Sequence, residues 1–306
     1  SVDKSEPAKT KKDRGFRMGP AAKKLLNEED VDLSDVKTSS KKGVVTKKDI
    51  LEAAEKKPEK VESKSSEVSV SGDGKNIKRV PMTRLRSVVA KRLLESQFST
   101  ASLTTFNEVD LYEVKKLREK YRDSFEQKFG VKLGFMGMFL KASSIALQDM
   151  PIVNASIDGN DIVYHGSQDI GVAVSTEKGL VVPVVRNVQE LSLAEIEMAI
   201  RDYSIKARDG KIEMADITGG TFTVSNGGVF GSLLSTPILN PPQSAILGMH
   251  KIQERPMVVD GNIEVRPMMY LALTYDHRLL DGKDAVSFLV KIKETLESPE
   301  SMILGV

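Results

Sequence analysis

The 306-residue sequence is poor in the side chains that carry redox, metal and thiol chemistry. It has no cysteine and only three histidines. The lack of cysteine excludes disulfides, thiolate metal sites and a thiol nucleophile on the protein. The few histidines argue against a zinc site as well, so we expect no metal.

An excess of charge of one sign and long hydrophobic runs are also absent. With 45 basic and 43 acidic residues the net charge is +2, which gives no reason to expect nucleic-acid or membrane partners. Apolar runs such as "GLVVPVV" at 179–185 are far shorter than the roughly 20 residues of a spanning helix. The polar start "SVDKSEPAKTKK" predicts no secretory signal, and its missing methionine suggests that a segment upstream has been cut away.

Changes in composition divide the chain into four segments. We predict a disordered linker, a small helical module, a flexible Lys-, Glu- and Ser-rich linker and one large domain, at 1–15, 16–55, 56–79 and 80–306. The module has two helix starts, with Pro20 at the first and Thr46 capping the second. Its core is so small that we expect docking rather than catalysis. The lysines of the first 78 residues are interpreted as a solvated coil, with an electrostatic docking surface as the alternative.

The large domain mixes helical and strand-like patterns without strict alternation, which predicts an α+β sandwich with a mixed sheet. The helix at 82–97 has Val88, Val89 and Leu93 on one apolar side together with Leu85. A second helix at 110–130 is predicted to bury Tyr121 and to stop at Gly130. Further helices are expected at 134–150, 192–210 and 282–298, and strands at 161–166, 169–176, 179–186, 220–226, 244–250 and 268–277.

One histidine stands where a strand ends, in "YLALTYDHRLLDGKDAVSFL" at 270–289. His277 is flanked by Asp276 and Arg278, and Asp281 follows four residues later. Histidine readily accepts a proton near neutral pH, so His277 is a candidate general base whose ring the nearby charges could orient. The alternative is a polar residue that merely caps the strand end, and "DHR" alone does not decide between them.

A second polar cluster lies in the glycine-rich stretch 219–250. The pair Asn226-Gly227 after an alternating strand is typical of a β-hairpin turn. However, three hydroxyls and a histidine gather in this otherwise apolar stretch, which favours the wall of a pocket. These candidate residues are Ser225, Ser232, Ser235 and His250.

The two clusters together resemble the catalytic domain of the dihydrolipoamide acyltransferases, the core subunits of 2-oxo acid dehydrogenase complexes. The motif D-H-R-x-x-D-G occupies 276–282, and "TFTVSNGG" occupies 221–228. The resemblance runs from about Val80 to Val306, and the module at 16–55 resembles that family's peripheral subunit-binding domain. It implies a chloramphenicol-acetyltransferase-like fold, trimers and a larger cubic core.

The resemblance also implies roles for single residues. His277 would take a proton from the thiol of dihydrolipoamide or coenzyme A, and Ser225 would donate a hydrogen bond to the tetrahedral oxyanion. Asp281 would orient and balance charge, and Asp276 and Arg278 are interpreted as scaffold. His277 and Ser225 would meet across a subunit interface.

The sequence resembles the succinyltransferase branch of the family most. A buried succinyl carboxylate needs donors, and Ser232, Ser235 and His250 match positions proposed to receive it. For His250 the alternative is a strand-end histidine with a backbone partner. Alternatives for the whole chain are an acetyl or branched-chain acyltransferase, a chloramphenicol-type enzyme, or a non-catalytic scaffold.

The small module departs from the family pattern. Thr38-Ser39-Ser40 replaces a glycine-containing stretch and Val44 stands in an arginine position. The resemblance implies docking of the dehydrogenase and dihydrolipoamide dehydrogenase subunits through 16–55, but valine cannot make the bidentate contacts of arginine with an acidic surface. The expected cofactor is lipoate on a lipoyl domain that this chain does not contain, with coenzyme A as substrate. We expect a bacterial cytoplasmic protein, with the mitochondrial matrix as the alternative.

Overall fold

The computed structural model describes residues 17–18, 44–45, 78–176 and 179–304. The chain forms two compact units, residues 1–81 and 82–306. In the first unit, strands β1 (Arg17–Met18) and β2 (Val44–Val45) pair in parallel. The two helices that we expected between 16 and 55 lie outside the described residues.

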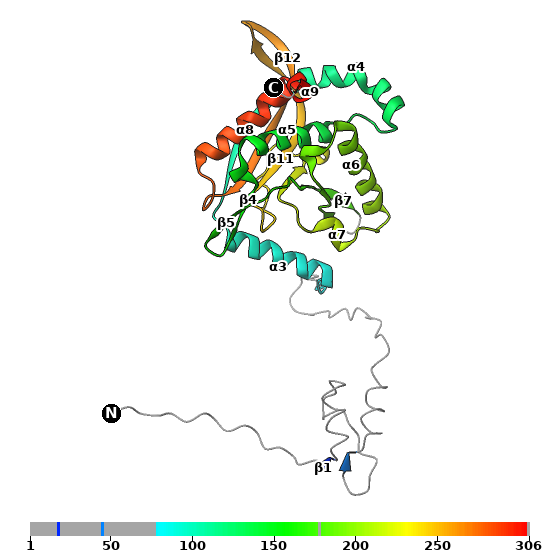
Figure 1. Cartoon of the computed structure of the whole chain (residues 1–306), viewed down its shortest axis with the longest axis vertical. Coiled ribbons are helices and arrows are strands. Elements are labelled where there is room, and N and C mark those ends of the chain that lie inside the picture. The colour runs from blue at the N-terminus through cyan, green and yellow to red at the C-terminus, as the bar shows by residue number, and fades with distance from the viewer. Residues whose placement is uncertain (1–16, 19–43, 46–77, 177–178, 305–306) are drawn as a thin grey trace, which may run out of the picture. The chain divides into compact units, whose positions relative to one another are not determined.

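The second unit is built on a six-stranded mixed sheet, which confirms the predicted α+β class. Its strands, in spatial order, are β3 (Ser102–Asp110), β12 (Asn262–Asp276), β11 (Ala245–Val259), β10 (Phe222–Asn226), β6 (Ile170–Val172) and β9 (Val184–Val185). Strand β10 is parallel to both of its neighbours, and the other pairs are antiparallel. The long β11–β12 hairpin extends beyond the rest of the sheet (Figure 1).

Helices follow the predicted segments closely. The five long helices are α3 (Arg84–Ser99), α4 (Tyr112–Phe129), α5 (Phe135–Asp149), α6 (Leu193–Arg208) and α8 (Gly282–Glu297). Gly130 ends α4 in the left-handed conformation, with φ +66°, which glycine adopts without strain. The shorter elements are η2 (Pro151–Asn154), η3 (Val188–Glu190), α7 (Met214–Ile217), η4 (Gly228–Phe230), α9 (Pro299–Leu304) and the strand pairs β4 (Ala155–Asp158) with β5 (Asp161–Tyr164) and β7 (Val174–Thr176) with β8 (Gly179–Val181).

The core lies between the sheet and two helices. α5 was predicted to be central because it is apolar nearly all round, and most of its residues are buried. It lies beside α8 over the sheet (Figure 1). Phe288 of α8 meets Phe222 of β10 edge to face, with ring centroids 5.6 Å apart, a favourable aromatic geometry.

Two expectations about local structure were wrong. Asn226-Gly227 does not turn a hairpin, because β10 pairs in parallel with β11 and the chain enters η4 instead. Tyr121 is 46% exposed rather than buried. The apolar side predicted for the helix at 82–97 belongs to α3, where Val88, Val89 and Leu93 are each more than 40% exposed.

Candidate active site

His277 lies in the turn directly after β12, held by the backbone. Its N–H donates to the carbonyl of Ala101 at 2.9 Å, which fixes the turn against the residue that follows α3 and its cap. The imidazole is exposed and has no hydrogen-bond partner among the described residues, while the ring of Tyr275 lies 5.7 Å away, centroid to centroid. An unpaired imidazole at a rigid strand end is free to exchange a proton with a substrate.

The charges on either side of His277 form the scaffold that the sequence predicted. Asp276 is 3% exposed, and its carboxylate accepts the guanidinium of Arg278 (Nη2–Oδ2 2.6 Å) and the backbone N–H groups of Arg278 and Ala101. Burial alone would raise the pKa of Asp276, but these hydrogen bonds outweigh it and hold the pKa below its usual value.

Asp281 has a structural partner that the sequence left open. It is the N-cap of α8, where its carboxylate accepts a hydrogen bond from the N–H of Asp284 at 2.8 Å. The carboxylate of Asp284 accepts in turn from the N–H of Asp281, which completes a capping box. The hydrogen bond from the Asp284 N–H lowers the pKa of Asp281. Burial and, as a smaller cause, the negative charge of Asp281 raise the pKa of Tyr275. Asp281 therefore interacts electrostatically with Tyr275 near the end of β12.

Ser225 is the penultimate residue of β10, followed by a loop that folds back onto β11. The N–H of Gly227 donates to Met249 O at 3.0 Å, and that of Lys251 donates to Ser232 O at 3.0 Å. Gly228 makes this approach feasible, because a Cβ there would lie 2.3 Å from the backbone of His250. The hydroxyls of Ser225 and Ser232 are half-buried and have no hydrogen-bond partner among the described residues.

His250 is buried beneath this loop and uses both ring nitrogens. Nδ1 lies 2.8 Å from Tyr270 O, and Nε2 lies 2.9 Å from the backbone N of Ser235 and 3.0 Å from its Oγ. A register shift in the β11–β12 ladder between Met249 and Ile252 places His250 opposite Tyr270. The backbone partner that we weighed as an alternative for His250 is therefore present, and a direct contact with substrate remains a prediction.

The structure groups the candidate residues at two ends of the sheet. Ser225 pairs with Gly248, which pairs with Ala272, and His277 lies five residues further along the β12 direction. With about 3.4 Å per residue and about 4.8 Å between strands, Ser225 and His277 are separated by roughly 17 Å along the strands and 10 Å across them. One chain therefore does not bring the two residues together.

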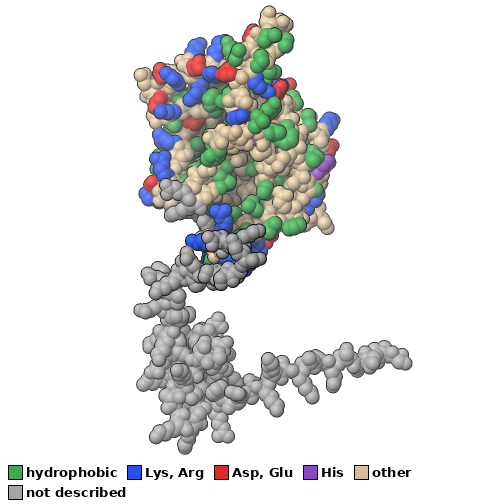
Figure 2. Space-filling view, turned by 180° about the vertical axis from the view of Figure 1, so that it is seen from behind, with side chains coloured by type: hydrophobic (Ala, Val, Ile, Leu, Met, Phe, Trp, Pro, Cys, Tyr) green, Lys and Arg blue, Asp and Glu red, His purple; other side chains and the backbone are tan. Residues whose placement is uncertain are grey.

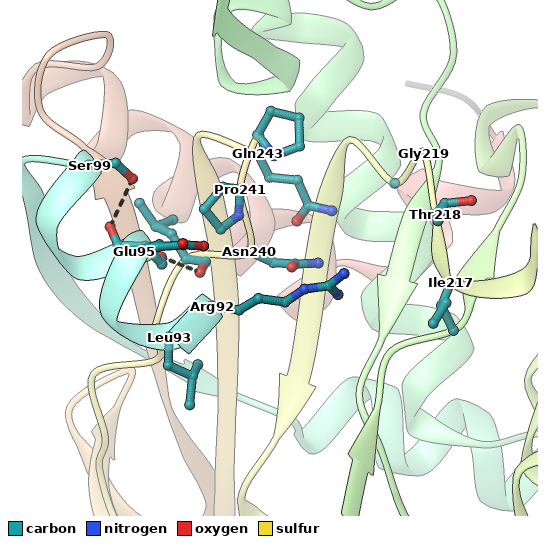
Figure 3. A pocket seen from close by; sticks show the side chains of 14 residues that line it. Arg92, Leu93, Glu95, Ser99, Ile217, Thr218, Gly219, Asn240, Pro241 and Gln243 are labelled. Carbon is teal, nitrogen blue, oxygen red and sulfur yellow. Dashed lines mark hydrogen bonds between the residues drawn. The ribbon is translucent and has the colours of Figure 1, made fainter. Parts of the chain in front are cut away.

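Two cavities border the His277 end. An open one of about 600 Å³ is lined by His277, Arg278, Leu103 and the end of α3. A second, of about 440 Å³, lies between α3 and the segments 217–220 and 239–243 (Figure 3), with Arg92, Asn240 and Gln243 among its lining residues. The second cavity contains none of the six predicted site residues.

Sequence reasoning missed the residues that position the others. Gly228, Tyr270 and Ala101 act through backbone atoms, so their side-chain types carried no signal except for the glycine of "NGG". Within 78–176 and 179–304 no group of His, Asp and Glu could hold a metal ion. No helix in this part of the chain has the length and apolarity to cross a membrane.

The fold and its two motif-bearing ends define the large unit as an acyltransferase domain. A family described as 2-oxoacid dehydrogenases acyltransferase (catalytic domain) matches residues 74–304, and an e3 binding domain matches 16–51. The chain belongs to the 2-oxoacid dehydrogenase acyltransferase family, as its two sequence motifs predicted.

Curated relatives match over almost the whole chain. The dihydrolipoyllysine-residue succinyltransferase component of the 2-oxoglutarate dehydrogenase complex from Pseudomonas aeruginosa is 58% identical, over 94% of this chain and 73% of that protein. The component of the same name from Escherichia coli K12 is 51% identical, over 94% and 72%.

Among solved structures, a probable dihydrolipoamide acetyltransferase from Listeria monocytogenes has TM-score 0.70 and 37% identity, covering 72% of this chain and 95% of that one. A structure of Azotobacter vinelandii dihydrolipoamide acetyltransferase has TM-score 0.71 and 33% identity, covering 74% and 94%. That structure was determined to investigate the roles of a serine, a histidine and an asparagine in its catalytic mechanism.

Proposed function

We propose that this protein transfers a succinyl group between dihydrolipoamide and coenzyme A as the core subunit of a 2-oxoglutarate dehydrogenase complex. The observation that carries the proposal is the 58% identity, over 94% of the chain, to a component with that name. The solved acetyltransferases are more distant, at 37% and 33% identity. An acetyl or branched-chain acyltransferase is therefore the less supported alternative.

In the proposed reaction, the imidazole of His277 accepts the proton of a thiol, because the thiolate is the nucleophile and an ordinary thiol is mostly protonated at neutral pH. The thiolate attacks the thioester carbonyl and forms a tetrahedral oxyanion, to which Ser225 donates a hydrogen bond. The carbon–sulfur bond to the other thiol then breaks. The departing thiolate takes the proton back from His277, so the base is regenerated.

The spacing of the residues supports these roles. In the Azotobacter enzyme the serine and the histidine investigated for catalysis are 52 positions apart, and the asparagine follows four positions after the histidine. Ser225, His277 and Asp281 have the same two spacings here. The third position carries a carboxylate in this chain in place of the amide.

The separation of Ser225 from His277 supports an active site shared between copies. Exposed apolar side chains flank both residues: Phe98 and Leu103 near His277, and Val229, Phe230, Leu233 and Leu234 beyond Ser225. Figure 2 shows hydrophobic side chains spread over one face of the unit. If the apolar side chains near His277 of one copy packed against those beyond Ser225 of another copy, the copies would form a closed head-to-tail ring, such as a trimer. The solved cubic core of the pyruvate dehydrogenase multienzyme complex is 33% identical to this chain, with TM-score 0.71. This similarity supports assembly of the trimers into a larger core.

The acyl specificity is proposed to come from Ser232, Ser235 and His250 at the Ser225 end. A free hydroxyl on Ser232 and the hydroxyl of Ser235 offer donors to the distal carboxylate of a succinyl group, which would otherwise be buried without compensation. An acetyl group has no such carboxylate, so it gains nothing from these donors.

The partners and the location are inferred from the matched e3 binding domain and from the organisms of the relatives. The e3 binding domain matched at 16–51 supports docking of dehydrogenase and dihydrolipoamide dehydrogenase subunits, although Val44 stands where arginine was expected. Lipoate, attached to a lipoyl domain, would carry the acyl group to this site. The relatives named above are bacterial, which favours bacterial cytoplasm over the mitochondrial matrix.

The test is the ratio of kcat/KM for succinyl-CoA to that for acetyl-CoA, with dihydrolipoamide as the acceptor. We expect a ratio well above one. A ratio below one would reject the succinyl pocket and keep the transferase mechanism. Absence of activity with both, for an assembled protein, would favour a non-catalytic scaffold.

A further inference from the structure

We propose that His250 does not touch the succinyl carboxylate but is a positioning residue, which holds Ser235 so that the hydroxyl of Ser235 can donate to that carboxylate. The inference rests on the proposed succinyl specificity and assigns the residue within that pocket that makes the contact. It follows from the hydrogen bonds of one buried imidazole.

The partners of His250 fix its tautomer. The carbonyl of Tyr270 can only accept, so Nδ1, 2.8 Å away, carries the hydrogen. The backbone N–H of Ser235 can only donate, so Nε2, 2.9 Å away, carries the lone pair. In this arrangement both ring nitrogens are occupied, and neither has an N–H left to offer to a substrate.

The same geometry leaves the hydroxyl of Ser235 available. Nε2 has one lone pair, and the Ser235 N–H already uses it, while the Oγ of Ser235 lies 3.0 Å from the same nitrogen. The hydroxyl hydrogen thus shares an acceptor that is already occupied. A carboxylate is a stronger acceptor, so the hydrogen can turn to a substrate while Nε2 stays satisfied by the N–H.

The surroundings hold His250 in this position. Its side chain is buried, at 1% exposure, and the loop at Gly228 lies directly against its backbone. Tyr270, which accepts from Nδ1, is braced in turn: its hydroxyl accepts from Arg255 at 3.0 Å, and Arg255 pairs with Glu108 at 2.7 Å. Turning the imidazole toward a substrate would break its hydrogen bonds with the carbonyl of Tyr270 and the N–H of Ser235 together, which costs free energy unless other partners replace both.

The two roles of His250 are distinguished by a double-mutant cycle. The variants of the full chain are His250→Asn, Ser235→Ala and the double variant, and the readout is the ratio of kcat/KM for succinyl-CoA to acetyl-CoA. The amide nitrogen of Asn can replace Nδ1 at Tyr270, but nothing then accepts from Ser235. We expect His250→Asn to lower the ratio about 10-fold or more, mainly through KM for succinyl-CoA, and to change it less than about 3-fold once Ser235 is alanine.

An equal loss of the ratio in both backgrounds would overturn the positioning role, since a residue that contacts the carboxylate itself acts independently of the Ser235 hydroxyl. His250→Gln provides the second measurement, also in both backgrounds. Its Oε1 can accept from Ser235 at the place of Nε2, so we expect a ratio closer to that of the unaltered protein than with Asn. A Gln variant no better than Asn would contradict the proposal.

The control is the unaltered protein. If it prefers acetyl-CoA, both the proposed acyl specificity and this inference fail. If it prefers succinyl-CoA and the cycle is additive, only the inference fails. Melting temperature and assembly size of each variant are compared with those of the unaltered protein. If His250→Asn does not assemble, Ser235→Ala alone tests the contact, and an unchanged ratio in that variant would contradict the proposal.

Discussion

The two ends of the sheet present their functional groups in different ways. At the His277 end, an ion pair and a helix cap, Asp276–Arg278 and Asp281, hold a turn whose imidazole is left exposed. At the Ser225 end, neutral hydrogen bonds and close backbone packing hold a loop over β11. We therefore expect the first end to respond to changes of charge and pH, and the second to changes of side-chain volume.

Removal of His277 gives the largest expected effect. We predict that His277→Ala lowers kcat by about 10²–10⁴-fold without changing assembly, because the imidazole makes no hydrogen bond within the described chain. The measurement is steady-state transfer between succinyl-CoA and dihydrolipoamide. His165→Ala is the matched control: this histidine contacts Ser156 at 3.0 Å, lines neither cavity at the His277 end, and should leave kcat within about 3-fold. Full activity of an assembled His277→Ala protein would refute the general base.

A single methyl group tests the Ser225 end. In Gly228→Ala the new Cβ would lie 2.3 Å from the backbone of His250, and backbone cannot move aside as a flexible side chain can. Strain of about 1–3 kcal/mol should displace the loop and lower kcat/KM about 10–100-fold. Gly166→Ala is the control, since a Cβ there meets nothing within 4 Å. If both variants behave alike, close packing does not hold this end.

The sequence predicted the features that depend on neighbouring residues and not those that depend on distant ones. Periodicity located the long helices and the strands, since each depends on neighbours a few residues away. The hairpin at Asn226-Gly227 was wrong because the partner of β10 is β11, some twenty residues on in parallel register. Gly228 is needed for its approach to His250, a contact that no local pattern encodes.

The same limit applies to the site. The motif D-H-R-x-x-D-G identified the His277 end because its scaffold, Asp276 and Arg278, is contiguous in sequence. A backbone partner for His250 was one of the alternatives, but which residues supply it was not predictable, since Ser235 and Tyr270 act through backbone atoms 15 and 20 positions away. Periodicity likewise located α3 and its apolar side, but it does not say what packs against that side, which is exposed among the described residues.

Asp276→Asn tests whether the negative charge of Asp276 stabilises the turn that carries His277. The amide can still accept from Ala101 or Arg278 N–H but no longer pairs with the guanidinium, so we expect a loss of about 1.5–3 kcal/mol in the free energy of unfolding and a lower kcat. Because the pKa of Asp276 is lowered in the fold, its stabilising contribution is present above the unfolded pKa of about 3.9 and is lost as pH falls through the folded value.

The Asn variant should therefore be less stable than the parent at pH 7, with the gap narrowing toward pH 3. Chemical unfolding of both proteins at a series of pH values measures this difference in the free energy of unfolding. Asp202→Asn is the control, because Asp202 and Arg201 form an exposed pair, for which we expect less than about 1 kcal/mol. A gap that does not change with pH would show that the ionised carboxylate is not what holds the turn.

The smallest effect is expected from Asp281→Asn, which separates charge from capping at the same end. Asparagine caps a helix about as well as aspartate, and the Azotobacter enzyme has an asparagine at the corresponding spacing. The N–H of Asp284 should keep its acceptor, so we expect an unchanged melting temperature and nearly unchanged kcat, whereas Asp281→Ala lowers both because α8 loses its cap. If Asn behaves like Ala, the negative charge itself, which also raises the pKa of Tyr275, is what the turn beside His277 requires.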